Sequence, residues 1–315
     1  MRGVLDRRGL SAEHASYVVE GLLEASLRGI DTHGIRLFPT YVAELDGGRS
    51  RARPTLRWLG GGRAARLLDA GHALGLVAGR VACAEAARLA REHGVGAVAV
   101  RNSNHFGAGS VYSLAMARMG MVGLCFSNTD ALVAPHNGVR PLFGTNPVSM
   151  AVQGRADDLF CADFATSQVA YSKVRHHQAH GMPLDPGWMV DGALKPLGGH
   201  KGQCLGMIVE ILCALLAGMP LDHELSHLYA PPFDEPRRVA HLFLALDMGA
   251  FRDPEEFRQE LSRLMEIVRS QPAAGAERVI VPGDLEAESA AVRRVHGIPM
   301  DDEEWRLFES LTASA

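Results

Sequence analysis

The chain has 315 residues, of which 47% are hydrophobic and 22% are charged, and its formal net charge is −4. This composition is that of a globular protein large enough for two modest domains. The charge balance gives no reason to expect nucleic acid or an anionic membrane as a partner. The first residues lack the apolar run of a secretory signal, and the five cysteines form no C-x-x-C pair. We therefore expect buried thiols in the cytoplasm.

The N-terminal third is predicted to be mainly helical. Residues 10–27 and 36–46 carry apolar residues at helical spacing, and Gly47-Gly48 ends the second helix. Two short strands are expected at 56–60 and 65–70, within a polar segment that is interrupted by glycine and proline. An amphipathic helix over 73–93 follows.

The middle of the chain alternates apolar runs with helical patterns, which indicates an α/β domain. Strands are predicted at 95–100, 121–127, 148–152, 159–164 and 239–248, and helices at 111–119 and 204–217. Residues 168–200 are mixed and loop-like. The C-terminal part is helical again, over 253–270 and over 285–311 with a Gly-Ile-Pro break at 297–299.

The sequence RNSNHFGAGSVY (101–112) connects the strand at 95–100 with the helix at 111–119. A glycine-rich turn before a helix leaves backbone N–H groups that can hold a phosphate. It is not a Rossmann fingerprint, because Tyr112 stands where the third glycine would be. His105 at the mouth of this turn favours a nucleotide-binding enzyme. A surface loop with an incidental histidine is the alternative interpretation, and this stretch alone does not decide between them.

Four other short motifs each have more than one interpretation. The sequence DTHG (31–34) presents His33 on a turn, as a general acid or within a helix cap. Asp163 opens DFATS (163–167), where it orients a histidine, binds a ribose or caps a helix. Lys201 in GGHKG (198–202) approaches a phosphate or a carboxylate closely, or lies in a flexible loop. The segment GVRPLFGTNP (138–147) is a ligand-facing loop or a tight turn.

Two histidine clusters have the spacing of metal ligands, but we expect no metal site. HELSH (223–227) matches the zinc-protease pattern H-E-x-x-H. Pro220 and Pro231-Pro232 leave barely two helical turns there, and no third histidine follows at the required spacing. His176, His177 and His180 have no carboxylate or thiolate nearby to complete a site.

Taken together and in this order, the motifs resemble the malate/L-lactate dehydrogenase family, which is unrelated to the Rossmann lactate dehydrogenases. That family also includes sulfolactate and ureidoglycolate dehydrogenases, diketogulonate reductase and the cyclic ketimine reductases. The resemblance extends over nearly the whole chain. The matching pieces are RGIDTHG (28–34) with Tyr41, RNSNHFGAG (101–109), SNT (127–129), PLFGTNP (141–147), DFATS (163–167), PLDPGWMVD (183–191), PLGGHKG (196–202) and VPGD (281–284).

The resemblance implies a fold and an assembly. It implies an α/β nicotinamide-binding domain with a mixed sheet that is not a Rossmann fold, together with a helical domain built from both chain termini. We place the α/β domain at 61–250 and the helical domain at 1–60 and 251–315. The resemblance also implies a homodimer with its active site near the subunit interface. A small 2-oxo or 2-imino acid is the expected partner.

The resemblance also assigns roles to residues. His33 is then the proton donor, Thr32 its relay neighbour and Asp163 the third member of the relay. A hydride passes from nicotinamide to the carbon of a C=O or C=N group, and His33 supplies the proton. The substrate is expected at Arg36, Tyr41, His105 and Thr145. The cofactor, NADPH with NADH as the alternative, is expected at His105, Phe106, Gly107, Ala108, Gly109, Asn128, Asp163, Ala165, Thr166, His200 and Lys201.

The chain departs from the family pattern at two places. The family's arginine commonly stands four residues after the histidine, but residue 37 is leucine and Arg36 comes one position early. The segment that follows Asp191 is also shorter than usual. The strings PLFGTNP and GGHKG are similar to the ketimine reductase branch, so we predict reduction of piperideine- or pyrroline-2-carboxylate. The alternatives are a 2-oxo acid/2-hydroxy acid dehydrogenase and a cofactor-binding homologue without catalysis.

Overall fold

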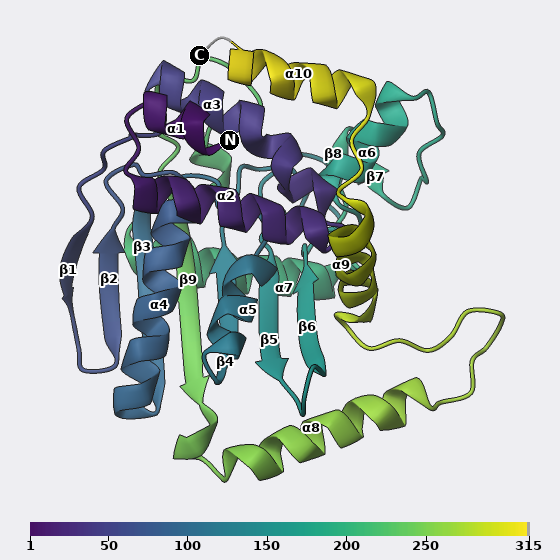
Figure 1. Cartoon of the computed structure of the whole chain (residues 1–315). Helices are drawn as coiled ribbons and strands as arrows, with labels where there is room; N and C mark the ends of the chain where they lie inside the picture. The colour runs from purple at the N-terminus through teal and green to yellow at the C-terminus, as the bar shows by residue number, and fades with distance from the viewer. Residues whose placement is uncertain (314–315) are drawn as a thin grey trace.

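A seven-stranded mixed sheet forms the centre of the molecule (Figure 1). The computed structural model describes residues 1–313. The strand order is β1-β2-β3-β9-β4-β5-β6, in which β2 and β3 are parallel and every other pair is antiparallel. The strands are β1 (Arg57–Gly61), β2 (Ala65–Asp69), β3 (Val95–Ser103), β4 (Met121–Ser127), β5 (Val148–Gln153), β6 (Leu159–Phe164) and β9 (Val239–Asp247). A separate two-stranded hairpin joins β7 (Met189–Val190) to β8 (Ala193–Leu194).

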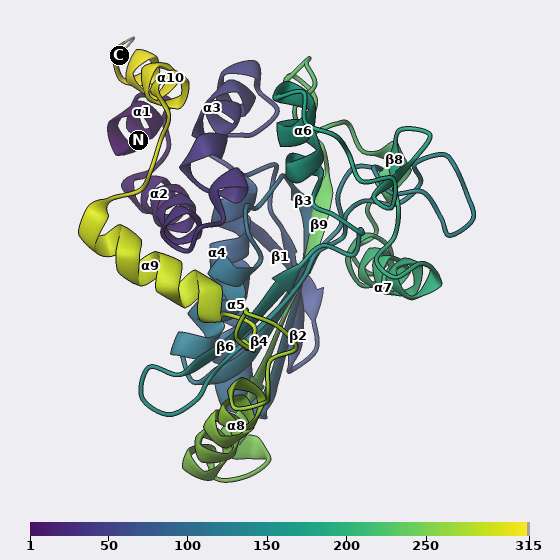
Figure 2. The same cartoon turned by 90° about the vertical axis from the view of Figure 1, so that its right-hand side faces the viewer.

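Helices cover both faces of the sheet. Helices α4 (Gly75–His93) and α5 (Ser110–Arg118) lie on one face, and α7 (His200–Glu210) lies on the other (Figure 2). A π-helical turn, Ile211–Leu215, continues α7. Helix α4 approaches β3 closely, because a Cβ atom on Gly96 would lie only 1.9 Å from the carbonyl oxygen of Ala86. Gly96 therefore permits the tight packing of this helix on the sheet.

The two ends of the chain form one group of helices above the sheet. Helices α1 (Arg2–Arg7), α2 (Ala12–Leu27) and α3 (Phe38–Gly47) lie beside α9 (Asp284–His296) and α10 (Asp302–Ala313) (Figures 1 and 2). The Arg293 Nη2 atom of α9 lies 2.9 Å from Asp31 Oδ2, which joins the two ends. The predicted fold class, a mixed-sheet α/β unit with helices from both termini, is confirmed.

Helix α8 (Pro254–Arg269) lies apart from the other C-terminal helices, at the opposite end of the sheet (Figure 1). Its Phe257 and Leu261 pack against the buried Val122 and Val152 of the sheet. The sequence places α8 in the second part of the helical domain, 251–315. The structure instead packs it on the α/β part, and the expected domain bounds stay a prediction.

The structure differs from the local predictions at four places. Helix α1 was not expected, because its six residues bury only Val4 and Leu5 and are too short to show a period. Helix α6 (Tyr171–Ala179) forms in the segment expected to be loop-like, where the polar string YSKVRHHQA has no apolar stripe. Cys204 is exposed on α7, whereas Cys83, Cys125, Cys161 and Cys213 are buried as expected. Helix α7 also begins at His200 rather than Cys204, so His200 and Lys201 lie in its first turn.

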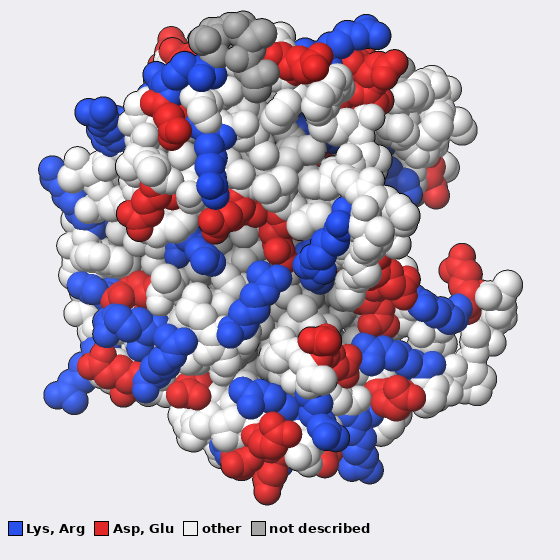
Figure 3. Space-filling model, in the orientation of Figure 1, with Lys and Arg blue, Asp and Glu red and all other residues white. Residues whose placement is uncertain are grey.

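The described surface mixes both signs of charge. On the face shown in Figure 3, acidic and basic side chains alternate and do not gather into one patch of a single sign. Among residues 1–313, no helix is both long enough and apolar enough to span a bilayer.

His241 lies in the core and makes the stability of the fold depend on pH. Its Nδ1 and Nε2 atoms are each 2.9 Å from a serine oxygen, Ser127 Oγ and Ser103 Oγ, and its ring stacks on Phe106 at 4.6 Å. Burial lowers the pKa of His241 to about 3. The folded protein therefore binds fewer protons than the unfolded chain below about pH 6.5.

We expect the free energy of unfolding to fall as the pH drops through this window. His241 alone should contribute a loss of about 1.4 kcal/mol for each pH unit between about 6.5 and 3. Urea denaturation at several pH values should show a shallower dependence in His241→Phe, which keeps the stacked ring but cannot titrate. Equal slopes in the variant and the natural protein would show that His241 is not responsible.

Candidate active site

One pocket of the described structure brings together most of the predicted site residues. Its volume is 430 Å³, within the range of small-molecule sites. The pocket is bounded by the 3₁₀ turn at Asp31–His33, the glycine turn before α5, the ends of β4 and β6, the start of α6 and the segment at 227–229. The predicted residues that line it are Thr32, His33, His105, Phe106, Gly107, Ala108, Gly109, Thr145, Asp163 and Ala165.

His33 lies half-buried in the wall of this pocket on a short 3₁₀ turn. Its Nδ1 atom is 2.9 Å from Thr32 Oγ1, so the threonine hydroxyl orients the ring. The Ser26 hydroxyl accepts a hydrogen bond from the Ile35 amide at 2.8 Å and fixes the chain just after the turn. Burial lowers the pKa of His33 to about 4, so the imidazole is neutral at neutral pH. A neutral imidazole of this kind can exchange a proton with a bound substrate.

His105 lies next to His33 and is held from behind by Tyr41. The two imidazole centroids are 5.6 Å apart, and His105 Nδ1 is 2.8 Å from Tyr41 Oη. Burial lowers the pKa of His105 well below its usual value, and His33 and Arg237 add to the shift. Tyr41 is fully buried and lies outside the pocket lining. The structure therefore places Tyr41 as a support for His105, and its predicted contact with the substrate stays a prediction.

The glycine turn places the N-terminus of α5 at the pocket wall. Gly107 has a φ of +78°, and the N-cap residue Gly109 makes no side-chain cap. Asp163 Oδ2 accepts a hydrogen bond from the Ser110 amide at 2.7 Å. Burial raises the pKa of Asp163 despite this bond. Among the described residues Asp163 thus caps α5, and no hydrogen bond joins it directly to His33.

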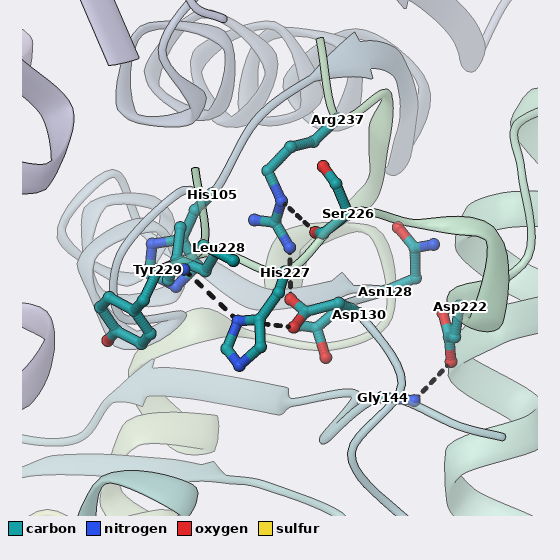
Figure 4. A network of polar contacts seen from close by, with 12 residues as sticks. His105, Asn128, Asp130, Gly144, Asp222, Ser226, His227, Leu228, Tyr229 and Arg237 are labelled. Carbon is teal, nitrogen blue, oxygen red and sulfur yellow. Dashed lines mark hydrogen bonds and ion pairs between the residues drawn. The ribbon is translucent and has the colours of Figure 1, made fainter. Parts of the chain in front are cut away.

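The loop before β5 is fixed by a buried carboxylate. Asp222 Oδ2 accepts a hydrogen bond from the Gly144 amide at 2.8 Å (Figure 4). It accepts a second one from Asn146 Nδ2 at 2.7 Å. Burial raises the pKa of Asp222 to about 7. These bonds hold the loop that brings Thr145 to the pocket. The Thr145 carbonyl in turn accepts bonds from the Thr166 amide and hydroxyl at 2.8 and 3.1 Å.

Several predicted residues lie outside the pocket lining. Asn128 is buried, and its Oδ1 atom accepts a hydrogen bond from the Ala240 amide at 2.8 Å, which joins it to β9. Thr166 is likewise buried behind Thr145. His200 and Lys201 are exposed in the first turn of α7. The positions of these residues support a structural role for Asn128 and Thr166, and the predicted cofactor contacts of His200 and Lys201 stay predictions.

Arg36 points away from the pocket. Its Nε atom lies 2.6 Å from Glu304 Oε1, an ion pair with α10 at the surface. The reason is local: the 3₁₀ turn Ile35–Leu37 buries both flanking residues and turns the arginine between them outward. The position of Arg36 therefore gives no support to the prediction that it contacts the substrate.

The sequence analysis missed a group of pocket residues from segments that are far apart in the chain. Asp130, His227, Tyr229 and Glu286 line the pocket, and the buried Arg237 pairs with Asp130 (Figure 4). The sequence motif HELSH suggests only a zinc site. In the structure its second histidine, His227, lies 3.3 Å from Asp130, which is 97 residues earlier in the sequence. No local pattern reports such a contact. Among the described residues, no three possible ligands form a metal site.

Comparison with known proteins identifies the family. The family model for malate/L-lactate dehydrogenase matches residues 1–309. A malate dehydrogenase from Pyrococcus horikoshii is 31% identical over 320 residues, covering 94% of this chain and 88% of that protein. Names of other relatives specify NAD⁺ or NADP⁺. Members of this family are dehydrogenases or reductases that use a nicotinamide cofactor.

Solved structures show the same fold. The malate dehydrogenase from Entamoeba histolytica superposes with a TM-score of 0.94 at 28% identity, covering 99% of this chain and 94% of that chain. A delta1-piperideine-2-carboxylate reductase from Pseudomonas syringae gives a TM-score of 0.86 at 28% identity, covering 98% and 96%. With the glycine turn, His33 and Asp163 in one pocket, this chain belongs to the malate/L-lactate dehydrogenase family, as a nicotinamide-dependent oxidoreductase.

Proposed function

We propose that this protein reduces the C=N bond of a cyclic ketimine carboxylate of the piperideine- or pyrroline-2-carboxylate type, with NADPH as the hydride donor. The observation that supports this most directly is the pair of imidazoles, His33 and His105, beside a glycine turn in one pocket. The solved piperideine-2-carboxylate reductase shares the whole fold. NADH is the alternative cofactor.

The residues around the glycine turn fit a nicotinamide cofactor. The N-cap residue Gly109 has no side chain, so the start of α5 at the pocket is open to close approach by a ligand, with Asp163 bound to the Ser110 amide. A Cβ atom on Gly109 would lie 2.8 Å from Ser149 Cβ and 3.1 Å from Asp163 Oδ1, so this close turn requires glycine. His105 to Gly109 would hold the cofactor there, and the bound cofactor supplies the hydride.

The chain's own contribution to the reaction is the proton. Reduction of C=N adds a hydride to carbon and a proton to nitrogen. We assign the proton to His33, whose ring Thr32 orients at 2.9 Å. Asp163 acts through the local structure, because it fixes the start of α5 through the Ser110 amide.

The lining of the pocket favours a substrate with a single carboxylate. None of the described residues that line it is lysine or arginine, whereas Asp130, Asp163 and Glu286 are carboxylic acids. A dianionic substrate such as oxaloacetate would be repelled by these carboxylates, and no lysine or arginine of the lining would offset the repulsion. A ketimine carboxylate carries only one acid group, and its ring nitrogen can be positively charged.

Two other functions have specific support. Reduction of an open-chain 2-oxo acid is favoured by the relatives that are named malate dehydrogenase. A cofactor-binding protein without catalysis is favoured by the outward position of Arg36, which leaves the pocket without the family's arginine.

The decisive experiment is to follow the oxidation of NADPH and NADH by absorbance with four substrates. These are piperideine-2-carboxylate, pyrroline-2-carboxylate, pyruvate and oxaloacetate. We expect turnover with the cyclic imines. Turnover with the open-chain acids alone would make the protein a hydroxy-acid dehydrogenase. Tight NADPH binding without turnover on any of them would favour a protein that has lost catalysis.

We further propose that the protein is a cytoplasmic homodimer. The outer face of α7 and its π-helical extension exposes an apolar row of Met207, Ile208, Ile211, Leu215 and Leu216, with exposed fractions of 41 to 60%. Such a continuous apolar face favours burial against another chain. The free state of all five cysteines in the described residues is in keeping with a reducing compartment. Light scattering should give twice the mass of 33.9 kDa.

A further inference from the structure

An anionic substrate needs a cationic or strongly donating group, and the pocket offers few. Its basic lining residues within the described structure are His33, His105 and His227. Burial lowers the pKa of His33 and of His105, so both rings are uncharged at neutral pH. Charge-assisted hydrogen bonds are the stronger means of binding a carboxylate. The remaining candidate is His227, whose side chain is 38% exposed at the pocket wall.

The contacts of His227 direct its second ring nitrogen to donate. Its Nδ1 atom is 3.3 Å from Asp130 Oδ2 and 3.3 Å from the Tyr229 amide nitrogen. The amide can donate only to an Nδ1 without a proton, which leaves the ring proton on Nε2. Because Asp130 and the Tyr229 amide both lie at Nδ1, Nε2–H is the ring group left to donate to a ligand. Figure 4 shows Nε2 on the side of the ring away from Arg237.

Asp130 is itself locked in place by a buried arginine. The guanidinium of Arg237, 3% exposed, pairs with Asp130 through Nη2 and donates from Nε to the Ser226 carbonyl at 2.9 Å. Asp130 is 7% exposed, so neither partner is free to rearrange in solvent. The rings of Tyr171 and Tyr229 flank the imidazole at 6.1 and 6.0 Å. Asp130 and Tyr171 come from distant parts of the sequence, yet both lie against this one histidine.

We propose that His227 binds the substrate carboxylate through Nε2–H, with Asp130 and Arg237 as the positioning residues that hold its ring. His227 thereby has the role expected of Arg36, whose side chain is instead paired with Glu304 outside the pocket lining. The inference rests on the proposed function only in that the substrate carries a carboxylate, which is true of the cyclic ketimines and of the 2-oxo acids.

The test compares an acid with its neutral amide. Steady-state kinetics of His227→Asn should be measured with the best acid of the substrate panel and with the corresponding primary amide. We expect KM for the acid to rise about 10- to 100-fold, as for the loss of one charged hydrogen bond, with little change in kcat. The KM for the amide should change little. His227→Arg should restore most of the affinity for the acid.

His223→Asn is the matched control. His223 is the other histidine of HELSH, four residues earlier, and it is exposed outside the pocket lining. This variant should leave both KM values unchanged. An unchanged KM for the acid in His227→Asn would overturn the proposal. So would an equal loss for acid and amide that His227→Arg does not repair, because that is the behaviour of a structural residue.

Failure of the proposed function gives a different result. Turnover of the open-chain acids alone would remove the ketimine assignment but leave the comparison of acid and amide in place. If the natural protein turns over none of the acids, binding can be measured instead. Calorimetry with NADP⁺-loaded protein should compare L-proline with L-prolinamide, and L-lactate with L-lactamide. A preference for the acid that disappears in His227→Asn supports the proposal without turnover. Equal binding of acid and amide to the natural protein would overturn it.

Discussion

Replacing His33 by alanine is expected to lower kcat for reduction by about 10²- to 10⁴-fold, the usual contribution of a positioned general acid. The Kd for NADPH should stay near that of the natural protein. The His33 side chain is bonded to Thr32 and makes no hydrogen bond to the glycine turn at 105–109. Stopped-flow or steady-state absorbance gives kcat, and fluorescence titration gives the Kd for NADPH. Retained turnover in His33→Ala would remove His33 as the proton donor.

The pH dependence of the natural protein tests the same assignment in a second way. The donor must carry a proton during reduction, and burial lowers the pKa of His33 to about 4. The protonated fraction of the free enzyme therefore grows as the pH falls toward that value. We expect kcat/KM for reduction to rise by up to about tenfold for each unit between about pH 8 and pH 5. The reverse oxidation needs the neutral ring and should be nearly constant over this range.

Two matched variants separate the imidazole from its surroundings. Thr32→Ser keeps a hydroxyl near His33 Nδ1, whereas Thr32→Val removes it and leaves a side chain of similar shape. We expect kcat of Thr32→Ser to be close to that of the natural protein. The kcat of Thr32→Val should lie between those of the natural protein and His33→Ala. His296→Ala removes an exposed imidazole at the end of α9, outside the pocket lining, and should have no effect. Equal loss in both threonine variants would argue against a role for the hydroxyl.

Local patterns predicted most of the secondary structure because each element carries its own period. The apolar run at Met121–Ser127 became β4 with the same bounds, and Leu159–Phe164 became β6. The order of the strands could not be predicted in this way. β9 inserts between β3 and β4 although more than a hundred residues separate it from either, and that pairing depends on tertiary packing.

The residues of the candidate site likewise fall into those that a local motif predicts and those that only tertiary packing reveals. His33, the glycine turn and Asp163 carry short motifs, so sequence could point to them. Asp130 and Arg237 carry none, and the motif that contains His227, HELSH, points to a different chemistry, so only the fold brings the three together. Arg36 shows the opposite case, in which the residue type fits a role but a 3₁₀ turn directs the side chain to Glu304. Short turns decide side-chain direction, and residue spacing alone does not reveal them.

A single buried arginine anchors the segment that supplies His227 and Tyr229 to the pocket. Arg49 is 1% exposed and donates hydrogen bonds to four backbone carbonyls, those of His227, Leu228, Ala230 and Pro232, at 3.4, 3.3, 3.0 and 2.7 Å. Its guanidinium also stacks on the Phe233 ring at 4.5 Å. Arg49 comes from the segment after α3, so it connects the N-terminal helices to the wall of the pocket.

Replacing Arg49 by methionine should therefore damage both stability and binding. The four carbonyls lose their charged donor, and we expect a loss of about 3–5 kcal/mol in the free energy of unfolding by urea. KM should rise more than kcat falls, because the 227–233 segment carries binding groups and not His33. Arg53→Met is the matched control, since Arg53 is exposed in the same segment and makes one bond, to the Gly9 carbonyl at 3.2 Å. If Arg49→Met were as stable as Arg53→Met and kept its KM, the 227–233 segment would hold its position without this anchor.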